Sequence, residues 1–194
     1  LDQSDKMGTI SFEASVSGAT LEGKSIDARL NGLIMQFQFK QYEYTNINLS
    51  GNLKDRTFNG MVNINDPNID LEFLGEVNLS DSVPVFNFKA NITDANLYAL
   101  NIDKSDPDFR VSCYLIANAK GNSINTMNGS ITLLNSLFVK KDQQLQVYDL
   151  RLVTENNTGG NRMKLRSDFL DADLYGKYEL TRVGESLKKY LITY

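Results

Sequence analysis

Histidine and tryptophan are absent from this 194-residue chain, and cysteine occurs only once, as Cys113. Without an imidazole, a Ser–His or Cys–His nucleophile pair has no base. Zinc sites lose their commonest ligands for the same reason. A single cysteine also excludes a disulfide within the chain. Cys113 shares the strand parity of Val111 and Leu115, which predicts a buried free thiol.

Other features that mark particular protein classes are scarce. Three prolines are too few for a proline-rich stalk, and no stretch approaches the roughly 18 apolar residues that span a bilayer. The 20 basic and 24 acidic residues are interspersed and give a net charge of −4, so no basic stripe favours nucleic acid. Phosphate-loop and dinucleotide-binding glycine motifs are also missing. We therefore expect no cofactor, no metal and no nucleic-acid partner.

The two ends of the sequence bear on its origin. Residues 1–5 do not resemble a signal peptide, and the chain lacks an initiator methionine. Turn signals recur at short intervals with no break in composition between them. We expect residues 1–194 to form a single β domain that is an excised segment of a much longer protein, with any signal or membrane anchor outside it.

Alternation of apolar and polar residues with period two dominates the chain and predicts strands throughout. Turn-forming residues such as those at 66–68, 80–82, 140–142 and 156–160 separate the alternating runs. The clearest runs are Ile10, Phe12, Ala14 and Val16; Ile69, Leu71, Phe73, Val77 and Leu79; Phe86, Phe88, Ala90 and Ile92; and Phe109, Val111, Cys113, Leu115, Ala117 and Ala119.

Two short stretches depart from this alternation. Residues 93–101 could begin with Thr93 or Asp94 as a helix N-cap. Residues 183–191 place apolar side chains at three-to-four spacing, which is typical of a helix. We therefore predict an all-β fold with one or two short helices.

A short pattern, hydrophobic-x-Gly-x-hydrophobic, returns along the chain. Its glycines have the parity of their apolar neighbours, so they lie on the apolar face, where a side chain would normally fill space. Glycine in a strand costs about 0.5–1 kcal/mol relative to alanine. A cost repeated on one face indicates a geometric need: either the sheet bends there or something approaches the backbone closely. These predicted sheet-bending glycines are Gly32, Gly51, Gly60, Gly75, Gly129 and Gly176.

Carboxylates are the remaining candidates for chemistry. Asp103, Asp106 and Asp108 cluster around a proline, where oxygens could bind Ca²⁺, although the spacing does not match an EF-hand loop. A second group, around residues 168–173, shows no pocket that would separate the pKa values of two acids. We interpret the first group as a plain turn at Pro107 and the second as a solvated turn and strand edge, and we predict no catalytic residue.

The alternating apolar residues form either a packed core or the lining of a hydrophobic groove. Both outcomes need the same pattern, because side chains of one parity share one face of a sheet. The predicted lining comprises Phe12, Phe37, Phe39, Phe58, Leu71, Phe73, Phe86, Phe88, Ile131, Leu133, Leu174 and Tyr178.

Three segments resemble a known family when they are read together. They are residues 90–101, 117–131 and 166–178, and their order and spacing are similar to those of the large TamB-like proteins of Bacteroidetes, relatives of the AsmA-like group. The resemblance covers residues 45–190. It rests on the residue pattern and its spacing, because these segments contain no catalytic motif. Residues 1–44 match only in their strand pattern.

The resemblance implies a fold, a location and a role. Such translocation and assembly modules have one N-terminal anchor in the inner membrane and a long periplasmic region folded as a half-pipe, or β-taco, with an apolar inner surface. The implied role in the Gram-negative cell envelope is passage of phospholipid along this groove, and support of outer-membrane protein assembly with a BamA-like barrel. Membrane contact would be made only by parts outside this segment.

The family implies no catalytic residues, so the function we expect is not enzymatic. A β-sandwich or barrel serving as a cell-surface binding or adhesion module would use similar glycines at its corners. A third alternative is a hydrolase or lyase built on the carboxylates. A continuous open apolar channel would favour the lipid conduit, whereas a closed core would favour the adhesion module.

Overall fold

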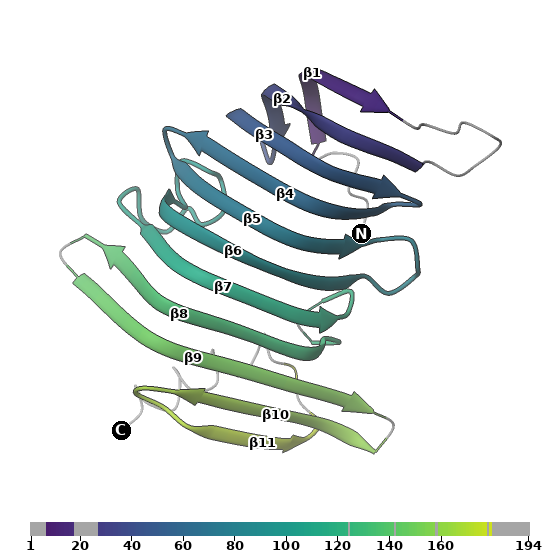
Figure 1. Ribbon diagram of the computed structural model, residues 1–194. Helices are drawn as coiled ribbons and strands as arrows, with labels where there is room; N and C mark the ends of the chain where they lie inside the picture. Colours follow the sequence, from purple (N-terminus) through teal and green to yellow (C-terminus); the bar gives the residue numbers. More distant parts are fainter. Residues whose placement is uncertain are drawn as a thin grey trace.

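The computed structural model describes residues 7–17, 27–123, 125–141, 143–157, 159–177 and 179. These residues form one eleven-stranded antiparallel sheet whose strands follow one another in sequence order (Figure 1). The strands are β1 (Met7–Ser17), β2 (Asp27–Phe39), β3 (Tyr42–Lys54), β4 (Thr57–Asp66), β5 (Ile69–Asn78), β6 (Val85–Asn96), β7 (Arg110–Lys120), β8 (Asn128–Lys140), β9 (Gln143–Asn157), β10 (Gly160–Ser167) and β11 (Ala172–Gly176).

The sheet is curved and open. Figure 1 shows the long central strands bending along their length, with β1 and β11 far apart at the two ends of the array. Within the described residues no second sheet packs against the first, as a sandwich would require. The predicted curved, elongated half-pipe is therefore confirmed.

The register sorts the side chains onto two faces. One row crosses seven strands with an apolar residue on each; it runs through Leu49, Val62, Phe73, Ala90, Leu115, Leu133 and Leu150. The neighbouring row on the opposite face is mainly polar; it runs through Asn48, Asn63, Glu72, Asn91, Tyr114, Leu134 and Asp149. Because successive side chains point to opposite faces, strict alternation yields one apolar face and one polar face.

The best-packed part of the apolar face lies beside the β2–β3 and β4–β5 turns. Tyr44, Ile47, Ala95 and Leu100 form its buried cluster, which is surrounded by partly buried apolar side chains. Leu100 belongs to the loop of residues 97–109 between β6 and β7. That loop reaches back to the β2–β3 turn, where the Asn101 side-chain amide donates a hydrogen bond of 2.8 Å to the carbonyl oxygen of Lys40.

The helix predicted for residues 93–101 does not form. Thr93 and Asp94 continue β6, which ends at Asn96, and residues 97–101 make a tight turn. The β6–β7 pairing shifts its register between Ile92 and Ala95, and Asp94 there has a φ of 52°. The Asn96 side chain then accepts a hydrogen bond from the Ala99 amide, so the capping chemistry read from the sequence closes one turn only. The second predicted helix, at 183–191, lies outside the described residues.

A buried carboxylate joins the first two turns on this side of the sheet. Asp66, at the end of β4, accepts hydrogen bonds from the Tyr42 hydroxyl and from the backbone and hydroxyl of Thr45. Burial alone would raise the pKa of Asp66, but these bonds and one from the Asn68 amide outweigh it and lower the pKa. Burial, and then the bond to Asp66, raises the pKa of Tyr42 to about 12.

Candidate apolar groove

The apolar face is divided into two parts by what covers it. We call the part beside the β2–β3 and β4–β5 turns the covered half, because Leu97 and Leu100 of the loop 97–109 pack on it. We call the part nearer the opposite strand ends the open half; its large side chains, such as Phe58, Phe73 and Phe88, are only partly buried, whereas the small side chains of Ala117 and Ala119 are buried. A packed core would have buried both parts alike.

The open half contains a pocket with an uncharged lining. Its volume is about 360 Å³, within the range typical of small-molecule sites. It lies over β6, β7 and β8 and is bordered by residues 121–123 and by Met127. The lining residues are Phe86, Phe88, Leu115, Ala117, Ala119, Gly121, Asn122, Ser123, Met127 and Ile131.

A row of aromatic rings leads across the strands to this pocket. The ring centroids of Phe58 and Phe73 are 6.3 Å apart, and those of Phe73 and Phe88 are 5.0 Å apart, both in tilted arrangements. These rings come from β4, β5 and β6. They form a continuous strip of apolar surface, since aromatic pairs at such distances are in favourable contact.

Three glycines line up on adjacent strands beneath these rings. Gly51 pairs with Gly60, and Gly60 pairs with Gly75. A Cβ atom on Gly60 would lie 2.3 Å from the carbonyl oxygen of Ser50 and 3.0 Å from the Phe58 ring. We call Gly51, Gly60 and Gly75 the glycine row. The neighbouring strands themselves approach too closely here for any side chain.

At Gly75 and Gly129 the backbone also adopts a conformation that favours glycine. Their φ angles are +147° and +133°, and a Cβ would lie 2.4 Å from the Asn87 oxygen and 2.2 Å from the Asn118 oxygen, respectively. Gly176 has a φ of +132°, and a Cβ added there would meet no atom within 4 Å, so the backbone angle is the only restriction. Gly32, in β2, pairs with Leu49.

The predicted lining residues separate between the two halves. Phe37 and Phe39 pack on the buried cluster of the covered half, whereas Phe58, Phe73 and Phe88 form the aromatic row. Phe86, Phe88 and Ile131 line the pocket. Leu71, Leu133 and Leu174 lie on the apolar face of β5, β8 and β11. Phe12, in β1, pairs with Ile34, and Tyr178 lies outside the described residues.

Sequence reasoning missed the residues that shape the two halves. The sequence predicts a helix over residues 93–101, and nothing local indicates that Leu97 and Leu100 cover a distant hairpin. Met127 shares the strand parity of Ile131 and lines the pocket, although the predicted lining does not include it. Its carbonyl oxygen accepts hydrogen bonds from Thr154 and Asn156, which fix the loop 121–127 against β9.

The polar face has a hollow of similar size but different chemistry. Met61 pairs with Leu74, and Leu74 pairs with Lys89. These three residues line a hollow of about 340 Å³ together with Glu72. Glu72 and Lys89 bring charged groups into this lining, whereas the pocket of the open half has none.

The acidic clusters have structural roles. Asp106 is 1% exposed and accepts a hydrogen bond from the Asp108 amide, while Asp103 accepts one from the Ser105 amide. Among the described residues no group of three or more acidic or cysteine side chains could hold a metal ion. Residues 103–108 do form a turn, but Asp106 within it is buried.

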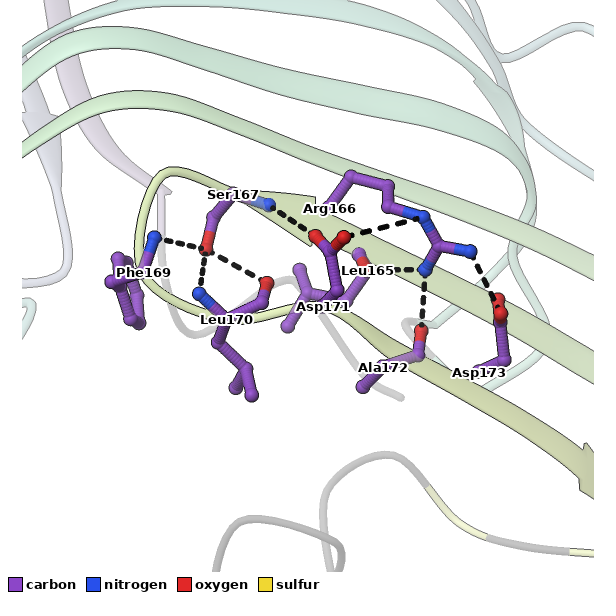
Figure 2. Close-up of polar contacts among 8 residues, drawn as sticks. All are labelled: Leu165, Arg166, Ser167, Phe169, Leu170, Asp171, Ala172 and Asp173. Atoms are coloured by element: carbon purple, nitrogen blue, oxygen red, sulfur yellow. Dashed lines mark hydrogen bonds and ion pairs between the residues drawn. The ribbon is translucent and has the colours of Figure 1, made fainter.

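Figure 2 shows the second acidic cluster closing the β10–β11 hairpin. The Arg166 guanidinium binds Asp173 at 2.7 Å and also donates to the carbonyl oxygens of Leu165 and Ala172. The hydrogen bond from Arg166 lowers the pKa of Asp173. Asp168 accepts a hydrogen bond from the Tyr148 amide, which ties the turn to β9. These carboxylates are exposed and turned toward the hairpin, so they do not form an acid–base pair in a pocket.

Cys113 lies buried on the apolar face of β7, as its parity predicted. Burial raises the pKa of its thiol, which favours the unreactive protonated form.

No family model, curated protein or solved structure matches the chain. The fold and the groove are therefore the guides to its function. The part of the chain that the structure describes contains no helix long and apolar enough to cross a membrane.

Proposed function

We propose that this chain is a lipid-conduit segment of a TamB-like protein of the Gram-negative cell envelope, and that it carries phospholipid acyl chains along its apolar face without catalysis. The observation that carries this proposal is the open half, a partly exposed apolar surface with an uncharged pocket. A monomeric soluble protein rarely exposes a large contiguous apolar surface unless something binds there.

An apolar face of this kind would let a hydrocarbon chain slide along it. Each CH₂ group removed from water contributes about 0.8 kcal/mol. Apolar contacts are non-directional, so neighbouring positions along a strip of phenylalanine and leucine side chains differ little in free energy. The headgroup can stay in water along the unclosed side of the sheet.

The proposal places the chain in the periplasm, tethered to the inner membrane by a part of the protein outside this segment. Support of outer-membrane protein assembly with a BamA-like barrel belongs to the same proposal. Both rest on the resemblance of residues 90–101, 117–131 and 166–178, together with the half-pipe form of the sheet.

Transfer of a fluorescent phospholipid between donor and acceptor vesicles tests the function. We expect the purified chain to accelerate transfer and to retain phospholipid detectable by native mass spectrometry. Leu115→Glu would place a charge in the pocket and should abolish both effects. Leu74→Glu, on the polar face, is the matched control and should leave them unchanged. Equal effects of the two substitutions, or no lipid bound by the unmodified chain, would refute the proposal.

A further inference from the structure

One half of the apolar face is already occupied by the protein itself. Leu100 is fully buried against Tyr44, Ile47 and Ala95, and Leu97 packs beside it. Of three further interactions, two tie the loop 97–109 to other parts of the sheet, and the one between Leu97 and Phe109 closes the loop at its base. Asn101 bonds to Lys40, the Leu97 amide donates to the Phe109 carbonyl oxygen at 2.9 Å, and the Lys140 ammonium donates to the Ser105 hydroxyl at 2.9 Å. Leu97 and Leu100 therefore already occupy this part of the apolar face.

The open half has the complementary properties. The rings of Phe58, Phe73 and Phe88 form its floor, and the pocket beside Met127 and Ile131 has no charged lining residue. Asn122 and Ser123 provide a polar rim where the loop 121–127 meets solvent. The surface is therefore apolar at the rings and polar at Asn122 and Ser123, which matches an apolar chain with one polar end.

A hydrocarbon chain fits this surface better than a peptide. The backbone groups of β6, β7 and β8 are engaged in ladders with their neighbours on both sides. A peptide lying on the face would leave its own amides without partners, and each unsatisfied buried amide costs about 1–3 kcal/mol. An acyl chain has no such groups.

We propose that one acyl chain binds along the open half, from the Phe58–Phe73–Phe88 row into the pocket at Met127 and Ile131, and that the loop 97–109 excludes it from the covered half. This inference rests on the proposed function and deepens it. The apolar face becomes a bounded single-chain site with its polar end at residues 121–123, instead of a trough used over its full width.

Photo-crosslinking distinguishes the two halves. Benzoylphenylalanine replaces Phe88 in one variant and Phe37 in the other; both residues are aromatic and lie on the apolar face, but Phe37 packs on the covered cluster. The probe is vesicles of palmitoyl-oleoyl phosphatidylethanolamine with a tritiated palmitoyl chain. We expect lipid labelling at 88 to exceed that at 37 by about tenfold, the preference that two additional buried methylene groups would supply.

A measurement on the unmodified chain guards against misfolding of either variant. With 16-doxyl-stearate as the paramagnetic probe, the methyl resonances of Met127 and Ile131 should broaden, whereas those of Ile47 and Leu100 should not. Broadening or labelling of equal size in both halves would overturn the bounded site while leaving the conduit intact. If neither half gives a lipid signal, the proposed function is overturned as well. Protein–protein crosslinks at 88 in place of lipid labelling would identify a second copy as the occupant and overturn the inference.

Discussion

Replacing Gly75 with alanine tests whether the glycine row is a requirement of the backbone. In an ordinary strand this change would be favourable, because alanine loses less conformational freedom on folding, by about 0.5–1 kcal/mol. At Gly75 the φ of +147° imposes strain of about 1–3 kcal/mol on a non-glycine residue. A Cβ would also lie 2.4 Å from the Asn87 oxygen and 2.5 Å from the Phe88 Cα, so two strands must separate.

We therefore expect Gly75→Ala to lower the free energy of unfolding by about 1–5 kcal/mol: backbone strain of about 1–3 and overpacking against the next strand of about 1–3, less an entropic gain of about 0.5–1. Urea denaturation followed by circular dichroism measures the change. Gly159→Ala is the control, because its added Cβ meets only the Asn157 side-chain oxygen, at 3.3 Å. Gly176→Ala isolates the backbone strain, because no atom lies within 4 Å of its Cβ. A loss at Gly75 no larger than that at Gly159 would refute the argument.

Further predictions concern the covered half, its buried carboxylate and the last hairpin. Leu100→Ala should cost about 2–5 kcal/mol in urea unfolding because it empties a fully buried site, whereas Leu74→Ala, 57% exposed, should change stability little. Asp66→Asn should lower the Tyr42 pKa from about 12 in a ¹³C-tyrosine NMR titration. The stability that Asp66 contributes is present above its unfolded pKa of 3.8 and is lost as the pH falls through its lower folded pKa, so wild type and Asp66→Asn should converge in acid. A difference in stability between them that stays constant as the pH is lowered through the acid range would contradict this. Arg166→Ala should speed amide hydrogen exchange in β11 without changing it in β5; unchanged exchange in β11 would show that the hairpin does not depend on this side chain.

Much of the fold could be predicted because its signals are local. Alternation with period two forces residues such as Leu71 and Phe73 onto one face of a strand, whatever lies elsewhere in the chain. The turn signals at 66–68 and 80–82 fall where one strand gives way to the next in the structure. The parity of Cys113 was enough to predict its burial.

The site could be predicted only in part, because parity gives the face and says nothing of what covers it. Phe37 and Phe88 have the same pattern in the sequence, yet one packs under a loop and the other lines an open pocket. The sequence pattern identifies the glycines on the apolar face, but it does not give the structural reason for them. At Gly60 and Gly75 the backbone of the next strand occupies the space of a side chain, and that distance depends on how adjacent strands coil together.

By itself the sequence determined an all-β chain with one apolar and one polar face, since side-chain direction in a strand depends only on position along it. Only the tertiary structure decided that the eleven strands stay in one open sheet and that half of the apolar face is covered. That decision rests on contacts such as Asn101 with Lys40, which are 61 residues apart. No local period encodes a contact of that separation, because it depends on the path of every strand between its two ends.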